Sequence, residues 1–127
     1  MQYKHYSEVP KSEWRWKNFT PKEIACKGTG EIIINEDALD CLQYARELYG
    51  KPMVINSAYR SISHNKSIGG SKNSRHLNGS AFDIKCAPED RDELIRVLRA
   101  AGFTGIGRYN TFVHADSGRE REWDFRK

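Results

Sequence analysis

The sequence predicts a single domain of the α+β class, from three observations. The chain has 127 residues, which suits one hydrophobic core and is too short for two cores of ordinary size. Two segments, residues 35–49 and 88–101, carry apolar residues at helical spacing. Short apolar or β-branched segments typical of strands lie between and after them, at residues 53–57, 80–85, 105–109 and 111–116.

The N-terminal part is predicted to be an irregular arm followed by a short helix. Residues 1–18 are polar and aromatic and form the expected arm across the domain. Thr20 and Glu23 have the spacing of a capping box, so we expect a helix to begin at Thr20. Residues 31–34 are apolar and β-branched and should be extended.

The two longer helices have recognisable ends. Asn35 is a suitable N-cap for the first helix, and Gly50 follows its last turn as a stop. Pro88 should open the second helix and Gly102 should end it. Each helix has one apolar stripe, so both are expected to be scaffold.

Residues 61–78 are rich in Ser, Asn, Gly, Lys and His, which predicts a long polar loop with at most a short helical turn near His64. A long loop in so small a domain suggests a functional segment. The charged tail at residues 119–127 carries no clear pattern. The main part of the domain is therefore expected at residues 19–118, between the arm and the tail.

The composition limits the classes of partner. Hydrophobic residues make up 38% and charged residues 30% of the chain, and no apolar run approaches the roughly 20 residues of a membrane span, so we expect no membrane insertion. The net charge is +4, but basic and acidic residues are interleaved, so nucleic-acid binding is not expected. We expect a monomer.

The cysteine content and the N-terminus indicate synthesis in a reducing compartment. Cys26, Cys41 and Cys86 have no metal-binding spacing and are expected to be reduced, although a disulfide between two of them stays open. The first residues contain no apolar region typical of a secretory signal. We therefore expect synthesis in the cytoplasm, and work outside it would need another export route.

A candidate metal site stands out in two segments about thirty residues apart. His76 and Asp83 lie in the first segment, and His114 lies in the second. Two imidazoles and one carboxylate are a common way to hold a catalytic Zn²⁺, because three protein ligands leave the fourth tetrahedral position open for water. Zinc lowers the pKa of such a water toward about 7, which favours hydrolysis of a peptide bond.

Other residues of these segments have candidate roles beside the metal. On a strand His114 and Asp116 share a face, so Asp116 is a candidate general base or an orienting partner of a ligand histidine. Arg60 could hold a substrate carboxylate through its bidentate fork. Ser74 and Tyr109 are candidates for lining the pocket, and Gly79 is expected to let the backbone pass close to the metal.

These residues lie in motifs by which the chain resembles the zinc D-Ala-D-Ala carboxypeptidase family, which includes the L-alanyl-D-glutamate peptidases of phage endolysins. The motifs are Ser57–Ser61, His64–Asn65, Gly69–Gly70, Ser74–Asp83 and Phe112–Asp116, and the resemblance spans roughly residues 19–118. It implies an α+β fold with a small antiparallel sheet flanked by helices, shared with the Hedgehog signalling domain.

The resemblance also implies a ligand set and a substrate. It implies Zn²⁺ held by His76, Asp83 and His114, an Arg60 that contacts substrate, and hydrolysis of peptidoglycan stem peptides at D-Ala-D-Ala or an L-Ala-D-Glu type bond. Many members have an acidic residue or a second histidine just before the last ligand, whereas residues 111–113 here are Thr, Phe and Val. Asp116 is therefore assigned as the base on strand geometry alone.

Two interpretations remain beside the peptidase, and the delivery route is an analogy. A zinc-containing module without turnover, such as a virion component that attaches to the cell wall, would fit the unfilled base position, and a nucleic-acid binder rests on charge alone. The compact chain is similar to phage or prophage members, which predicts release to the bacterial cell wall during lysis or delivery by the virion.

Overall fold

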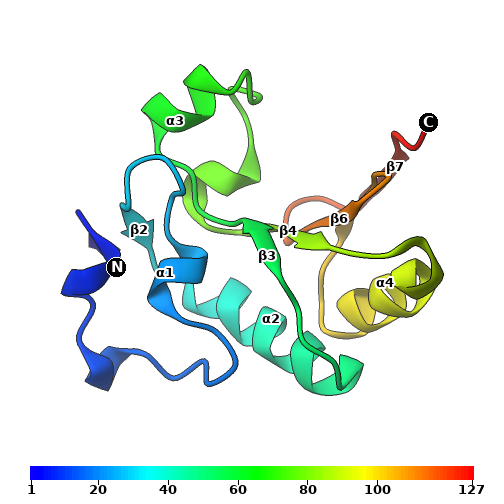
Figure 1. The fold of residues 1–127 in the computed structure, drawn as a ribbon, viewed down its shortest axis with the longest axis horizontal. Helices are drawn as coiled ribbons and strands as arrows, with labels where there is room; N and C mark the ends of the chain where they lie inside the picture. Colours follow the sequence, from blue (N-terminus) through cyan, green and yellow to red (C-terminus); the bar gives the residue numbers. More distant parts are fainter.

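The computed structural model describes residues 1–127 and confirms the α+β class (Figure 1). A five-stranded sheet has the order β3-β4-β6-β5-β7. Its strands are β3 (Ile55–Ser57), β4 (Ala81–Lys85), β5 (Gly105–Arg108), β6 (Phe112–Asp116) and β7 (Arg121–Asp124). All neighbouring pairs are antiparallel except β5 and β7, which are parallel. The sheet thus differs from the expected antiparallel one only in its outermost pair.

The predicted longer helices are present and cover one side of the sheet. Helices α2 (Glu36–Tyr49) and α4 (Arg91–Ala100) pack against each other there, and the shorter α3 (Ile62–Ser67) lies on the other side (Figure 1). The Asn35 side chain caps α2, and Gly50 ends it with φ of 71°. Pro88 opens a 3₁₀ turn, η4 (Pro88–Asp90), so the α-helix itself begins three residues later than expected.

The N-terminal arm is more closely built into the domain than the sequence suggested. Strand β1 (Gln2–Tyr3) pairs antiparallel with β2 (Ile32–Ile33). After β1 the arm continues with two 3₁₀ turns, η1 (Tyr6–Glu8) and η2 (Lys11–Glu13). The side chains of Trp16, in the arm, and of Phe19, directly after it, are buried in the core. Burial of these two aromatic side chains gives the arm its driving force to pack.

The capping box at Thr20 is confirmed. Thr20 Oγ1 accepts from the backbone N–H of Glu23 at 3.3 Å, and the Glu23 carboxylate accepts from the Thr20 N–H at 3.0 Å. The helix that it opens, α1 (Pro21–Ile24), is four residues long. It leads to the segment in which Cys26 is buried, and all three cysteines are free thiols.

The polar loop at residues 61–78 has more structure than expected. Helix α3 occupies the region of the predicted turn near His64, and Ser61 caps it. A second short helix, the 3₁₀ helix η3 (Arg75–Asn78), carries His76 into the domain. The loop therefore holds its functional side chain on a regular element, which restricts the positions that this side chain can take.

The predicted tail contains a strand. Residues 121–124 form β7, which pairs with β5 and completes the sheet. This strand was not predicted, because the run Arg-Glu-Trp-Asp lacks an apolar alternation. No helix is both long and apolar enough to cross a lipid bilayer.

Candidate metal centre

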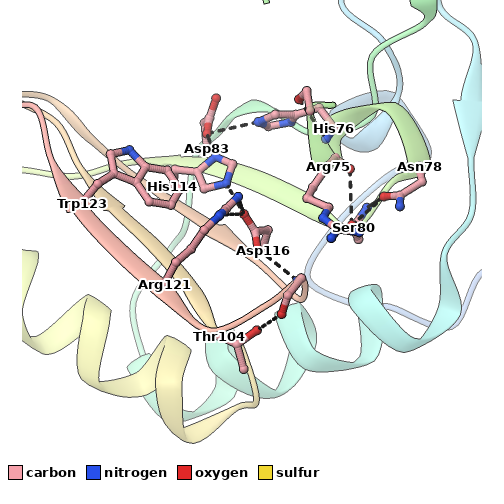
Figure 2. A network of polar contacts seen from close by, with 12 residues as sticks. Arg75, His76, Asn78, Ser80, Asp83, Thr104, His114, Asp116, Arg121 and Trp123 are labelled. Carbon is pink, nitrogen blue, oxygen red and sulfur yellow. Dashed lines mark hydrogen bonds and ion pairs between the residues drawn. The ribbon is translucent and has the colours of Figure 1, made fainter. Parts of the chain in front are cut away.

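The sheet brings two of the three predicted ligands together. Asp83 on β4 is directly opposite His114 on β6 in the antiparallel pair, and Ala81 is opposite Asp116. Helix η3 adds His76 from the adjoining loop, as Figure 2 shows. His76, Asp83 and His114 each offer a ligand atom, and these atoms lie within 4.8 Å of one another. The fold thus brings the three candidate ligands together, while Asp116 is not part of the group.

His76 is prepared to act as a ligand. Its side chain is almost fully buried, and its Nδ1 lies 2.6 Å from the backbone carbonyl oxygen of Ala58. Because a carbonyl can only accept, Nδ1 carries the proton and Nε2 keeps a free lone pair. That Nε2 is buried and makes no hydrogen bond, although Asp83 Oδ1 is 3.3 Å away. A buried ring nitrogen without a partner, facing a carboxylate and a second imidazole, fits a metal ion.

Asp83 and His114 are in direct contact. His114 Nδ1 lies 2.9 Å from Asp83 Oδ1. Burial alone would raise the pKa of Asp83, but its contacts with His114 and His76 outweigh burial and hold the pKa well below its usual range. Burial would likewise lower the pKa of His114, but the carboxylates of Asp116 and Asp83 raise it. Asp83 is therefore an ionised carboxylate, the form that binds a cation.

Arg60 contacts the candidate ligand Asp83 and is largely engaged within the protein. Its guanidinium donates to Ser57 Oγ at 3.1 Å, to Asn65 Oδ1 at 3.2 Å and to Asp83 Oδ2 at 3.3 Å. Its side chain is only 15% exposed. The arginine still borders the open cleft, where the remaining donors can face a substrate.

Asp116 lies behind His114 and away from the other two ligands (Figure 2). Its Oδ2 lies 2.7 Å from His114 Nε2 and 2.8 Å from an Arg121 nitrogen, and its Oδ1 accepts from the Gly118 N–H at 3.0 Å. The residue is completely buried. Burial opposes ionisation of Asp116, but the contacts with His114 and Gly118 outweigh it and lower the pKa. Of the two roles predicted for Asp116, this geometry favours orientation of His114 over proton transfer.

Of the remaining predicted residues, Ser74 and Tyr109 lie at the cleft and Gly79 does not. Ser74 and Tyr109 both line the cleft, and Ser74 Oγ caps η3 by accepting from the His76 N–H at 3.2 Å. Gly79 is not among the residues that line the cleft, and the atoms nearest to its Cβ position belong to Ile33 and Asn35, so the predicted close approach to the metal does not explain this glycine. It ends η3 with φ of 76°, and a Cβ there would lie 3.2 Å from the carbonyl oxygen of Ile33. The left-handed backbone explains this glycine.

The structure adds residues that the sequence did not single out. The metal centre opens into a cleft of about 280 Å³, which Arg75, Arg121 and Trp123 also line. Arg75 makes no side-chain hydrogen bond or ion pair, whereas Arg121 is bound to Asp116. Arg121 and Trp123 are two residues apart, a spacing that places both side chains on one face of a strand. This spacing would have pointed to them only if a strand had been expected at residues 121–124.

Together, the α+β fold, the buried His-Asp-His group and the cleft beside it define a metal site of the open type that is common in enzymes. The family model for peptidase M15 matches residues 17–116, which include all three candidate ligands. The chain belongs to this family. The chain is also 34% identical, over 123 residues, to the zinc D-Ala-D-Ala carboxypeptidase of Streptomyces albus G. That alignment covers 93% of this chain but 47% of the relative, so the chain spans about half the length of the relative.

Proposed function

We propose that this chain is a zinc-dependent peptidase that hydrolyses peptidoglycan stem peptides. The observation that carries the proposal is the buried group His76, Asp83 and His114, which lines an open cleft. The relative whose name states zinc and D-Ala-D-Ala carboxypeptidase supports both the metal and the class of substrate. A metal site open to a cleft is typical of catalysis, whereas structural zinc sites are closed by four protein ligands.

The donor set fits Zn²⁺. His76 offers Nε2, His114 offers Nδ1 and Asp83 offers a carboxylate oxygen, a combination that zinc accepts. When bound, zinc would polarise the substrate carbonyl and activate a water for attack. The protein contributes the orientation of each ligand, because every one of the three has a further hydrogen-bond partner that fixes it: Ala58 for His76, Asp116 for His114 and Arg60 for Asp83.

The charge of the cleft supports a substrate that carries carboxylates. Arg60, Arg75 and Arg121 all border it. Arg121 is bound to Asp116 and Arg60 to Asp83, whereas the guanidinium of Arg75 has no acidic partner. Stem peptides that end in D-Ala present a free carboxylate, which an arginine fork can bind through two hydrogen bonds. Arg60 and Arg75 are the two candidates for this contact.

The test is to incubate the zinc-loaded protein with purified peptidoglycan and to identify the released fragments by mass spectrometry. Chelator-sensitive release of D-Ala would establish a carboxypeptidase, and chelator-sensitive new internal amino termini would establish an endopeptidase. A His76→Ala variant is the matched negative control, and His64→Ala is the positive one, since His64 is absent from the metal group. Zinc-loaded protein that releases neither product from several peptidoglycan types would refute the proposal.

The inactive wall-binding or virion module corresponds to one outcome of the same test. One observation is compatible with such a module: the lining of the cleft includes no carboxylate other than Asp83, so no second carboxylate is in place as a general base. Sedimentation with cell walls in the absence of turnover would favour that module.

Two further expectations stay predictions. They are release by a phage, which rests on the resemblance, and a monomeric state.

A further inference from the structure

The strand β7 lies after the residues that the family model matches, yet its side chains reach the metal centre. The model covers residues 17–116, and β7 spans Arg121–Asp124. Strand β5 separates β7 from β6, which carries His114 and Asp116. Side chains of β7 would normally be kept away from β6 by those of the strand between them.

Two glycines on β5 remove that separation. In the registers of the sheet, Gly105 is opposite both Asp116 and Arg121, and Gly107 is opposite both His114 and Trp123. A Cβ on Gly105 would overlap the Asp116 carboxylate, and a Cβ on Gly107 would overlap the Trp123 ring. Both glycines have ordinary backbone angles, because neither is among the glycines with positive φ. Space for these side chains, and not backbone freedom, therefore explains both glycines.

In the space that Gly105 leaves free, Arg121 binds the buried Asp116. Its two terminal nitrogens lie 2.8 and 3.3 Å from Asp116 Oδ2, the oxygen that also contacts His114 Nε2 at 2.7 Å. A fully buried carboxylate is stabilised by a cationic partner and is costly without one. Figure 2 shows the resulting chain from Arg121 through Asp116 to His114 and Asp83.

In the space that Gly107 leaves free, Trp123 packs against the imidazole of His114. The ring centroids are 5.1 Å apart with an interplanar angle of 47°. The tryptophan is itself held, because its Nε1–H donates to the Tyr109 hydroxyl at 3.0 Å and the Arg121 guanidinium lies over its ring at 4.6 Å. The imidazole of His114 is thus in contact with the tilted ring of Trp123 and, at Nε2, with Asp116.

We propose that Arg121 and Trp123 are positioning residues of the metal centre, which hold Asp116 and His114 so that His114 presents Nδ1 to the metal. The proposal rests on the proposed function only for the identity of the metal. Its prediction is that zinc affinity depends on β7, even though β7 supplies no ligand. Partners that orient metal-ligating histidines are typically worth about 10- to 100-fold in metal affinity.

The experiment measures the zinc dissociation constant of the full chain by competition with a chromophoric chelator, without any substrate. Arg121→Ala is expected to weaken zinc binding by about 10- to 100-fold, and Arg121→Lys by less, because lysine keeps the charge but loses the fork. Trp123→Ala should weaken binding, and Trp123→Phe should largely restore it. Arg119→Ala is the matched control, because Arg119 is exposed and contacts neither Asp116 nor His114.

A second readout separates positioning from a general loss of stability. In the zinc-loaded protein the Nε2 proton of His114 should be protected by Asp116 and give a downfield, slowly exchanging NMR signal. Arg121→Lys and Trp123→Phe, which should fold, are expected to broaden or shift this signal in proportion to their loss of zinc affinity. Folded Arg121 and Trp123 variants with wild-type zinc affinity and an unchanged signal would overturn the proposal, whether or not the enzyme hydrolyses peptidoglycan.

Discussion

At the scale of single residues, the metal centre is defined by which nitrogen of each histidine is free. Ala58 fixes the proton of His76 on Nδ1, and Asp116 faces Nε2 of His114. The two histidines therefore offer different ring nitrogens to the metal, Nε2 and Nδ1 respectively. Neither tautomer could be inferred from sequence, because each depends on a hydrogen-bond partner that only the fold brings into contact.

Replacing Asp116 by asparagine separates its two candidate roles. An orienting carboxylate predicts that Asp116→Asn weakens zinc binding by about 10- to 100-fold, because the amide loses its charge-assisted contacts with His114 and Arg121. The measurement is a chelator competition titration. Unchanged zinc affinity combined with a roughly 10²- to 10⁴-fold loss of turnover would instead make Asp116 the general base.

Replacing Arg60 by lysine tests the substrate contact. The fork of Arg60 reaches Ser57, Asn65 and Asp83 at once, which the single ammonium group of lysine cannot do. We expect Arg60→Lys to raise KM for stem peptides that end in a free carboxylate more than for the same peptides with an amidated end. Steady-state kinetics on the matched pair measure this, and an equal effect on both peptides would contradict a carboxylate contact.

At the scale of elements, short-range sequence patterns predicted the ends and the buried faces of the helices, because these depend on residues close together in the chain. The caps at Thr20 and Asn35, the stop at Gly50 and the apolar stripes of α2 and α4 were all visible in the sequence and are present in the fold. The strand period also placed His114 and Asp116 on one face. The missed element, β7, is stabilised by a parallel pairing with β5 and by contacts across two glycines, and no local pattern encodes such contacts.

The N-cap of α2 offers a test at this scale. The Asn35 side chain accepts from the Ala38 N–H at 3.1 Å and donates to the Asn78 carbonyl at 3.3 Å, which ties α2 to the end of η3. Asn35→Ala should lower the free energy of unfolding by about 1 kcal/mol, as measured by urea denaturation of the zinc-free protein. Tyr44→Ala on the exposed side of α2 should stay within about 0.5 kcal/mol, and an equal loss in both variants would count against the cap.

At the scale of the whole molecule, the sheet, the two longer helices and the N-terminal arm share one core, and the candidate metal ligands come from three separate segments, η3, β4 and β6. Sequence motifs identified those candidate ligands, but apart from Asp116, which shares β6 with His114, the residues that orient them lie on other elements. Ala58 follows β3, Arg60 lies just beyond it, and Arg121 comes from β7. A metal that binds three segments should therefore stabilise the whole fold.

Removal of zinc should accordingly lower the unfolding temperature. A ligand that binds only the folded state at 100 times its dissociation constant adds about 2.7 kcal/mol to the free energy of unfolding. Thermal unfolding with zinc and with chelator should differ for the wild-type chain and for His64→Ala, but not for His76→Ala. If the unfolding temperature of the wild-type chain were the same with zinc and with chelator, this would argue against zinc binding to the folded state.

The most direct test of the central claim is a crystal structure of the zinc-loaded protein with anomalous data at the zinc edge. We predict one zinc ion bound by Nε2 of His76, Nδ1 of His114 and a carboxylate oxygen of Asp83, with Asp116 still in contact with His114 Nε2. Zinc at another group of residues, or bound through Nε2 of His114 with Asp116 displaced, would contradict this description of the metal centre.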